Sequence, residues 1–504
     1  MKERWFNYRP LCLIFGFLLL GSVFAFYLLK QVAFCITIAL IMALSLTILA
    51  IYKKKPQYVL VPVIAFVLGV GMYYTAVRQF NKGVDYIPTT IDTRICNISE
   101  QENGMIKVEG DSCVFDGNKQ NDNITIYIYD NDGLFENIEI GSIIQFKPYR
   151  FYKADLFYYD MPSVNLFEND LKYTVSALME DIKYIRTDLT FAEQIKEKIH
   201  NNLHYGLSNE NAEIAYSTLF GDKEMLSEKQ YSVYKLSGVA HLLAVSGLHV
   251  GIIVGILQFI LCWRHKQNWL KFALISLVLL FYAYLCDFSV SIVRAGIMAM
   301  ILMIAKLTKR EYDSFNSISI AGIVIFCLNP LCIFDVGFLL SFSCVIGITM
   351  LYKPILKALK KTRMSKSVVE GVSISLASTI SILIVMAYYF KTLNIISIVA
   401  NVILIPIFTI AFMCVFVVGF ASIGFPFLCV VLNPINYIFG FINIIATVLG
   451  NLSISNFNTL EFNFISIVIY FLLLLFMGRF CTAKYQYKIF ATLPMVALLF
   501  YCLL

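Results

Sequence analysis

Charged residues are scarce in this chain, and the motifs of molecular motors are missing. Only 14% of its 504 residues are charged, whereas 59% are apolar and the mean hydropathy is +0.74. This composition excludes a large water-soluble core and indicates an integral membrane protein. No glycine-rich phosphate loop ending in Lys-Ser or Lys-Thr occurs, so no nucleotide-driven motor is visible in the sequence.

Hydrolase motifs are also missing around two histidines near the middle of the chain. His241 and His249 have no carboxylate between them and are too far apart for the helix of zinc proteases. Ser246 lacks the glycine of a nucleophile elbow, because Ala244 stands two residues before it. We therefore expect no catalytic residue, no metal ion and no cofactor, and predict that the chain is not an enzyme.

Long apolar runs predict a polytopic α-helical membrane protein with about 13 transmembrane helices, since a helix needs about 17–25 apolar residues to span a bilayer. The runs lie at 11–29, 32–52, 58–77, 239–263, 269–287, 289–307, 316–333, 336–352, 367–390, 395–423, 427–450, 463–479 and 487–504. No small-residue cleavage site follows the first run, so we expect it to be retained.

Lysine and arginine are distributed unequally between the short loops. Alternate connections hold 21 of these residues, whereas the opposite ones hold only Lys30 and Lys391. By the positive-inside rule the N-terminus is cytoplasmic, and the large polar insert and the C-terminus are extracytoplasmic.

The insert after the third span predicts β-structure over 79–188. Ile124–Tyr129 alternates with a period of two, and short apolar stretches begin at Met105 and after Gly141. Several short strands over about a hundred residues indicate a small barrel or sandwich. An extracytoplasmic domain permits a disulfide, and its two cysteines, Cys96 and Cys113, would face each other if the hairpin turned near 104 and 105.

Helices are predicted over 189–238. Thr190 and Glu193 form a capping box ahead of an apolar stripe that starts at Phe191 and ends at Leu203. This helix could lie on the membrane surface or pack against the β domain. A second helix should end at Gly221, and Ser227 with Gln230 should cap a third.

Polar residues within the apolar runs mark candidate sites, because each costs free energy in hydrocarbon unless it is paired or faces water. His241, Ser246, Gly247 and His249 lie together in one run. Arg294 lies near the outer end of another. It could contact an anionic substrate, or form a structural pair with Asp287 or Asp335.

Two later spans carry further polar groups. Hydroxyl residues from Ser373 to Ser381, including Ser375 and Ser378, could line a path, although helix–helix hydrogen bonding is the favoured interpretation. Asn394, Asn401 and Pro406 interrupt the next run, which predicts a broken helix that lines a pore.

Several of these residues belong to a longer series of motifs. In chain order these are Leu219-Phe-Gly-Asp222, Gly238-Val-Ala-His-Leu-Leu-Ala-Val-Ser-Gly-Leu-His-Val250, Val290-Ser-Ile-Val-Arg-Ala-Gly-Ile-Met298, Asp313, Asn329-Pro330, Val336-Gly-Phe-Leu-Leu-Ser-Phe342 and Ile398-Val-Ala-Asn-Val-Ile-Leu-Ile-Pro406. The series resembles the ComEC competence family, the DNA uptake channels of transformable bacteria, over about 210–420. The histidine–serine–glycine–histidine string is its most specific element.

The resemblance implies a multi-pass protein of the bacterial cytoplasmic (inner) membrane that conducts single-stranded DNA into the cell during natural transformation. It implies a DNA path formed by His241, Ser246, Gly247, His249, Arg294, Ser375, Ser378 and Asn401, and structural roles for Asp287, Asp335, Gly337 and Pro406. Expected partners are single-stranded DNA, a DNA receptor, a cytoplasmic helicase or strand-binding protein, and membrane lipids.

The family also carries an outward barrel of the OB type, in agreement with the predicted β domain. OB folds often bind single strands through a basic groove, but residues 78–190 hold 11 basic and 19 acidic residues, a net charge of −8. Either a local groove binds DNA or the domain is a structural lid, and we favour the lid. The groove residues would be Lys147, Arg150, Phe151, Tyr152 and Lys153.

Many family members end in a domain that resembles metallo-β-lactamases. No His-x-His-x-Asp-His string occurs here, so we expect a separate protein to degrade the second strand. The predicted domains are a three-helix membrane segment (1–78), an OB-like β domain (79–188), amphipathic or interfacial helices (189–238), a channel domain (239–480) and a final transmembrane helix (481–504). The alternative function is a secondary transporter or flippase for a small or lipidic anion.

Overall fold

The computed structural model describes residues 9–27, 57–82, 86–100, 105–120, 122–129, 139–154, 166–167, 169–223, 225–261, 268–361, 365–394, 396–452, 457–458 and 470. The chain forms two compact units. One comprises Leu13–Ile195 and Val324–Asp335, and the other comprises Met1–Cys12, Lys196–Ile323 and Val336–Leu504.

Two apolar helices open the first unit: α1 (Pro10–Tyr27) and α3 (Gln57–Phe80). They cross where glycines let the backbones meet. A Cβ built on Gly21 would lie 2.3 Å from the carbonyl oxygen of Phe66, and one on Gly69 would lie 2.2 Å from that of Leu18. Such small-residue contacts are typical of helix pairs in membranes, where burial of apolar surface does not drive association.

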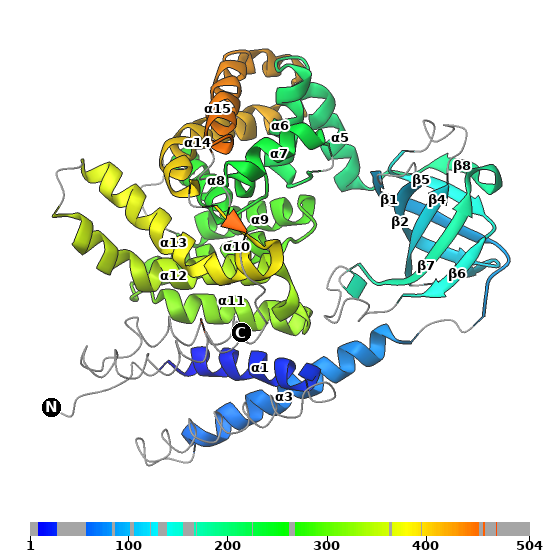
Figure 1. Ribbon diagram of the computed structural model, residues 1–504, viewed down its shortest axis with the longest axis horizontal. Coiled ribbons are helices and arrows are strands. Elements are labelled where there is room, and N and C mark those ends of the chain that lie inside the picture. The colour runs from blue at the N-terminus through cyan, green and yellow to red at the C-terminus, as the bar shows by residue number, and fades with distance from the viewer. Residues whose placement is uncertain are drawn as a thin grey trace. The chain divides into compact units, whose positions relative to one another are not determined.

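The predicted β domain follows as one eight-stranded sheet (Figure 1). Its strands are β1 (Ile91–Glu100), β2 (Met105–Phe115), β3 (Asn118–Lys119), β4 (Asn123–Tyr129), β5 (Ser142–Phe146), β6 (Arg150–Lys153), β7 (Leu171–Leu178) and β8 (Lys183–Thr187). The hydrogen-bonded order is β6-β7-β4-β2-β1-β5-β8, with β3 beside β2. Only the pair β4–β7 is parallel among these strands.

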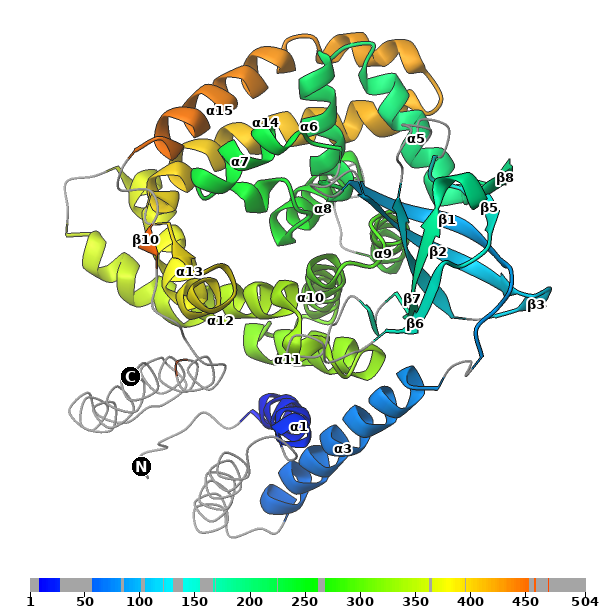
Figure 2. The same cartoon turned by 45° about the vertical axis from the view of Figure 1, so that its right-hand side comes forward.

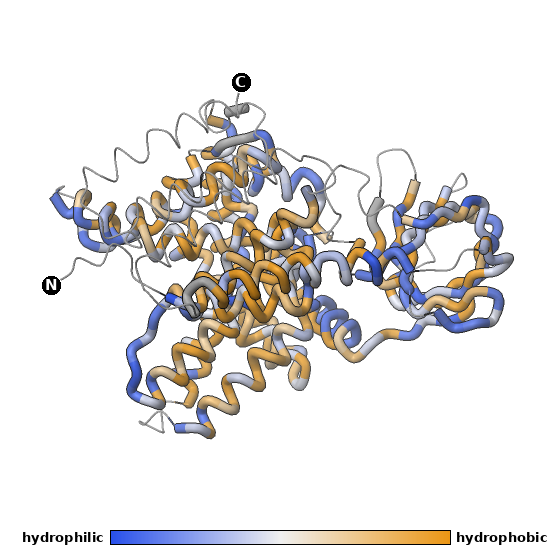
Figure 3. Tube along the Cα trace, turned by 90° about the horizontal axis from the view of Figure 1, so that it is seen from below, coloured by the Kyte–Doolittle hydropathy of each residue, from blue (hydrophilic) through white to orange (hydrophobic). Residues whose placement is uncertain are grey.

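Alternation along the strands builds the core of this domain. Ile124, Ile126 and Ile128 of β4 are fully buried, as the period of two predicts. They join the buried side chains Ile91, Ile95, Val108, Cys113, Phe115, Ile144, Phe146, Tyr173, Val175 and Ala177. Hydrophilic and hydrophobic residues accordingly intermingle along the strands, whereas the helices are largely hydrophobic (Figure 3).

The predicted disulfide is not formed, because the register of the hairpin keeps its cysteines apart. Ile95 pairs with Gly110 and Asp92 with Val114, so the two thiols lie at different levels of the ladder. The Cys96 thiol donates to the carbonyl oxygen of Glu109, whereas the Cys113 thiol lies 3.4 Å from the hydroxyl of Thr93. Both cysteines are free within the part of the chain that the structure describes.

Reduction of the full-length protein is therefore expected to leave its electrophoretic mobility unchanged. Burial raises the pKa of Cys96 and of Cys113 to about 12, so both thiols should react slowly with iodoacetamide at neutral pH and rapidly after unfolding. Mass spectrometry of the alkylated protein measures this difference. A mobility shift on reduction that disappears in Cys96→Ser would show that the bridge exists.

The second unit is helical. Its helices are the greater part of α5 (Phe191–Leu203), α6 (Asn209–Phe220), α7 (Glu228–Leu236), α8 (Gly247–Ile260), α9 (Trp269–Leu285), α10 (Val290–Leu307), most of α11 (Ser314–Leu328), α12 (Val336–Leu359), α13 (Lys366–Phe390), α14 (Ser397–Ser422) and α15 (Ile435–Gly450). Helix α10 packs against α8, α9 and α12, and α14 packs against α6, α8, α13 and α15 (Figure 2). Helix α8 therefore lies between α10 and α14.

Among the described residues, six helices are long and apolar enough to cross a membrane, and a seventh span results if one bent pair is counted. Helices α8, α9 and α11 are apolar but shorter. Large apolar side chains such as Leu277 and Ile444 are 64% exposed, as lipid-facing residues would be. The chain is thus a multi-pass membrane protein. The predicted runs at 32–52 and 487–504, and all but one residue of 463–479, lie outside the described residues.

Two predictions about the spans are wrong. The run at 239–263 is not one helix, because a 3₁₀ turn, Ala240–Leu242, precedes Ser246, which caps the start of α8. The run at 395–423 is not broken either, since α14 continues through Pro406. This proline is exposed. The break lies instead between the 3₁₀ helix η6 (Pro426–Leu432) and α15, which form an angle of 50°.

The predicted caps after the β domain are confirmed. Thr190 and Glu193 form a reciprocal box at the start of α5, and Ser227 and Gln230 form another at the start of α7. Gly221 ends α6 with a φ of +82°. Within the second unit, α5 buries Ile199 and Leu203, and Ile199 meets α14 near Gly419. The first turn of α5 also meets the β domain, as one of the two predicted placements expects, because Glu193 pairs with Arg94 of β1 at 2.8 Å.

Candidate functional site

The serine, glycine and histidine of the central motif form the start of helix α8. Ser246 is the N-cap, and its hydroxyl accepts a hydrogen bond from the amide of Leu248 at 3.3 Å. The Nδ1 atom of His249 accepts from the amide of Ser246 at 3.0 Å. His249 thus takes the place that Glu or Gln usually has in a capping box, which explains the three-residue spacing.

The ring of His249 is fully buried against helix α14. It lies edge-on to Phe412, with 4.4 Å between ring centres, and also contacts Phe408. Its Nε2 atom has no hydrogen-bond partner among the described residues. His249 therefore holds the start of α8 against α14 and does not present an exposed ring, whereas His241 in the preceding turn is exposed.

Arg294 of α10 meets the same end of α8. Its side chain is buried, with 6% exposed, and Nη1 donates to the carbonyl oxygen of Ser341 in α12. A Cβ on Gly247 would lie 2.9 Å from Nη2 of Arg294, so the glycine makes room for the guanidinium. The Nε atom has no partner in the described part of the chain.

One of the two carboxylates predicted to pair with Arg294 has another partner. Asp287 lies in the turn between α9 and α10 and binds the ammonium of Lys196 at 2.9 Å. Asp335 ends a 3₁₀ turn that directly precedes α12, and Gly337 lies in the first turn of α12. The hydrogen bond of Arg294 goes to a carbonyl oxygen. Because this acceptor carries no net charge, the contact does not neutralise the guanidinium.

Most hydroxyls of α13 bond within their own helix. Ser378 donates to the carbonyl oxygen of Ser375 at 2.9 Å, and Ser381 donates to that of Ala377 at 2.9 Å. Ser375 instead donates to Ile398 of α14 at 3.4 Å and accepts from the amide of Asn401 at 3.5 Å. These bonds join α13 to α14, as the favoured interpretation of the hydroxyl row predicts.

Asn394, predicted to interrupt a span, caps one instead. Its side-chain oxygen accepts from the amide of Ser397 at 3.1 Å, and its side-chain amide donates to the carbonyl oxygen of Leu236 at the end of α7. Gly238, with a φ of +75°, permits this approach, because a Cβ there would lie 2.6 Å from Ser397. Asn394 therefore fastens the start of α14 to the end of α7.

The contact between Gly247 and Arg294 favours the binding of an anion. The first turn of a helix carries partial positive charge, and a guanidinium beside it adds a full charge in a region of low dielectric. Phosphate and carboxylate groups match the planar donors of arginine.

The comparisons with known proteins concern this same part of the chain. A family model described as "Competence protein" matches residues 218–484, which is more than half of the sequence. The chain belongs to the competence protein family. The ComE operon protein 3 of Bacillus subtilis is 28% identical to it over 196 residues, which are 39% of this chain and 24% of that protein.

A second relative is the Recombination protein 2 of Haemophilus influenzae, 30% identical over 156 residues, which are 29% of this chain and 19% of the relative. The competence family member described here thus matches about a quarter or less of the length of these relatives. No solved structure matches the chain significantly.

In this competence family member the predicted groove of the β domain is only partly exposed. Lys147, Arg150, Tyr152 and Lys153 are exposed, with Tyr152 at 57%. Phe151 instead points inward and stacks on Tyr173, with 5.0 Å between ring centres. Alternation along β6 turns this partly buried ring toward the core, whereas its neighbours on β6 are exposed.

Sequence reasoning missed Tyr149, which is 63% exposed and lies beneath the guanidinium of Arg150 at 5.7 Å. Its position next to Arg150 in the sequence was a sufficient signal. The exposed face of this edge therefore comprises Tyr149, Arg150, Tyr152 and Lys153.

Proposed function

We propose that this protein conducts single-stranded DNA across the bacterial cytoplasmic membrane during natural transformation. Family membership supports a role in competence, and the single observation that carries the proposal further is the position of Arg294. This buried cation meets the start of α8 inside the segment that matches the family model. A phosphate of the DNA backbone is an anion that such a pair would bind.

Passage requires that the site opens. Arg294 is 6% exposed and His249 is fully buried, so a strand reaches the guanidinium only when α8 and α10 separate. We assign His241, Ser246, Gly247 and Arg294 to the path, and His249 to the positioning of α8. The contact between α13 and α14 borders the path. It includes Ser375, Ser378 and Asn401.

The β domain is proposed to be an OB-type barrel on the outer face of the membrane. Strands β1, β2 and β4 form a meander, and β4 pairs in parallel with β7. Strand β5 pairs with β1, and the next strand, β6, pairs with β7. These two consecutive strands thus lie on opposite sides of the meander, which closure of a barrel must join. The exposed edge from Tyr149 to Lys153 could stack and attract a single strand, although the acidic domain around it favours a lid.

The cytoplasmic N-terminus and the extracytoplasmic C-terminus, inferred from lysine and arginine in the loops, belong to the same proposal. So do the partners: a DNA receptor outside, a helicase or strand-binding protein inside, a separate nuclease, and lipids. The proposed domains remain those of the sequence, with 239–480 as the channel.

A transporter or flippase for a small or lipidic anion is the second candidate. The 50° bend between η6 and α15 favours it, because discontinuous helices often form the substrate sites of transporters. Arg294 would then bind a carboxylate or phosphate headgroup.

Uptake of DNA in cells that lack the protein separates the two candidates. The channel predicts that fluorescent DNA stays outside, that uptake of small anions and lipid asymmetry remain normal, and that the wild-type gene restores entry. Entry of DNA at the wild-type level without the protein would exclude the channel. A defect in anion or lipid transport with normal DNA entry would establish the second candidate.

A further inference from the structure

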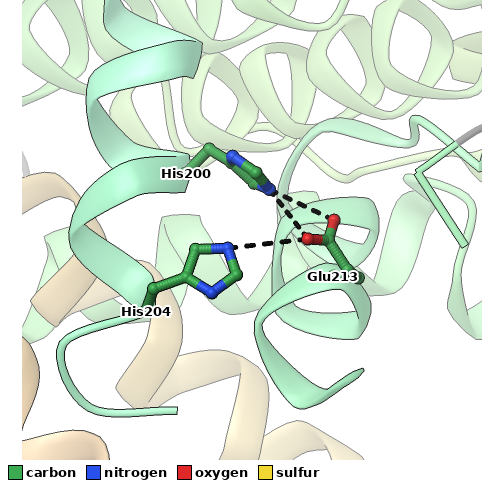
Figure 4. A group of neighbouring side chains, drawn as sticks. All are labelled: His200, His204 and Glu213. Carbon is green, nitrogen blue, oxygen red and sulfur yellow. Dashed lines mark hydrogen bonds and ion pairs between the residues drawn. The ribbon is translucent and has the colours of Figure 1, made fainter. Parts of the chain in front are cut away.

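Two helices that follow the β domain bring two imidazoles and one carboxylate together (Figure 4). The Nε2 atom of His200 lies 3.0 Å and 3.1 Å from the two carboxylate oxygens of Glu213. The Nε2 atom of His204 lies 3.5 Å from one of the same oxygens. One ligand atom from each residue can be chosen so that all three lie within 4.8 Å of one another.

Helical spacing brings the two histidines together, and the turn into α6 adds the carboxylate. His200 lies in the last turn of α5, and His204 follows directly after Leu203, the last residue of α5, so their four-residue spacing places both rings on one side of the helix end. Helix α6 begins after a short turn. Asn209 is its first residue, and Glu213 follows four residues later. The side-chain oxygen of Asn209 lies 3.3 Å from Nδ1 of His204.

The contact with Asn209 engages the Nδ1 atom of His204 and leaves its Nε2 atom for Glu213 or a metal ion. If Nδ1 carries the proton and donates it to the amide oxygen, the lone pair of Nε2 points toward Glu213. Histidines that bind metal ions are commonly held by a hydrogen bond from the other ring nitrogen, which orients the ring.

The geometry points to a Zn²⁺ site, and we propose that His200, His204 and Glu213 bind one zinc ion that links α5 to α6. Zinc prefers tetrahedral sites with bonds of about 2.0–2.1 Å to nitrogen and about 2.0–2.2 Å to oxygen. Ligand atoms in such a site are about 3.3–3.5 Å apart. The separations of 3.0 Å and 3.5 Å from Glu213 match this spacing within a few tenths of an ångström.

The cluster is also accessible to an ion. The side chains of His200, His204 and Glu213 are 23%, 32% and 21% exposed, so solvent reaches the site without any opening of the core. A water molecule can take the fourth position. Asn201 follows His200 where zinc proteases have their glutamate base, so the site is structural and not hydrolytic.

A zinc ion here would stabilise the packing of the α5–α6 turn within the helical unit. The carbonyl oxygen of Gly206 in this turn accepts from the side chain of Asn436, and Asn211 of α6 donates to the same asparagine at 2.9 Å. Asn202 of α5 donates to the carbonyl oxygen of Ser422 at the end of α14. The ion would thus hold together two helices that dock on α14 and α15.

Metal analysis of the full-length protein in detergent tests the proposal. After removal of metal with a chelator and dialysis against a small excess of Zn²⁺, the wild type should retain one additional zinc ion per chain compared with His200→Ala, His204→Ala and Glu213→Gln. Asn201→Ala, an exposed position on the same helix, is the matched control and should retain the ion. Removal of zinc should lower the melting temperature of the wild type and of Asn201→Ala, but not that of the three variants.

Cobalt identifies the ligands independently of stability. Co²⁺ bound to the wild type should give the visible absorption of a tetrahedral site, and His204→Cys should keep the ion and add a sulfur-to-cobalt charge-transfer band, since a thiolate is also a zinc ligand. Equal metal content in wild type and Glu213→Gln, or no bound ion in the wild type, would mean that the cluster is only a set of imidazole–carboxylate hydrogen bonds. Neither result would bear on the passage of DNA.

Discussion

Replacement of Arg294 with leucine is expected to slow DNA entry strongly while the protein remains in the membrane at its normal level. A hydrogen bond from a charged donor contributes about 1.5–3 kcal/mol, and loss of that interaction with a moving phosphate corresponds to about a 10- to 100-fold slower passage. Transformation frequency and entry of labelled DNA measure the loss. Immunoblots of membrane fractions measure the level of the protein.

The leucine variant should lose transport without losing stability, because burial of Arg294 is itself unfavourable. Its charge has left water, and its Nε atom has no partner among the described residues, so burial of the arginine carries an uncompensated cost. Leucine removes this cost. A structural arginine would behave in the opposite way, with loss of the protein from the membrane in proportion to the loss of transport.

Gly247 offers a way to move Arg294 without replacing it. A methyl group at 247 would lie 2.9 Å from Nη2, at the flexible end of the arginine side chain, so Gly247→Ala should displace the guanidinium and reduce DNA entry. Gly251→Ala is the matched control on the same helix, since a Cβ at 251 meets nothing within 4 Å. Equal transport by both variants would remove the start of α8 from the path.

Replacement of Gly206 with alanine should cause the largest loss of stability in the helical unit. A Cβ at this position would lie 1.7 Å from the carbonyl oxygen of Cys429 and 2.5 Å from its carbon. Both atoms belong to the backbone of η6, so no side-chain rotation relieves the clash, and overpacking of this kind costs about 1–3 kcal/mol or more. We expect a strongly reduced level in the membrane and a lower melting temperature in detergent.

The same substitution at Gly440 gives the comparison. A Cβ on this glycine of α15 meets nothing within 4 Å, and alanine favours a helix by about 1 kcal/mol over glycine. Gly440→Ala should therefore be as stable as the wild type or more so. If Gly206→Ala matched it, the turn after α5 would not dock on η6 as described.

Local patterns were sufficient wherever one segment determines its own structure. The capping boxes at Thr190 and Ser227 and the glycine stop at 221 were predicted correctly, because a cap depends on residues within one turn of the chain. The strand at Ile124–Tyr129 was predicted from its alternation. Pairing across the sheet was not, and the disulfide failed because register depends on bulges that the sequence does not reveal.

The cluster of His200, His204 and Glu213 illustrates a signal that was present but unused. His200 and His204 have the four-residue spacing that metal ligands on a helix often have, yet Glu213 lies on the next helix, so its place beside them becomes visible only in the folded structure. His249 shows the reverse case. The resemblance placed this residue in the DNA path, and the fold shows that its ring caps α8 and packs on Phe412.

By itself the sequence determined a multi-pass membrane protein of the competence family with a β domain after its first helices, because hydropathy, alternation and motif order are properties of a linear chain. Only the tertiary structure decided that His249 is buried, that Arg294 meets Gly247, and that the bend lies at 432–435 and not at Pro406. These facts depend on which helices pack together, since the free energy of a buried polar group is set by its neighbours in space.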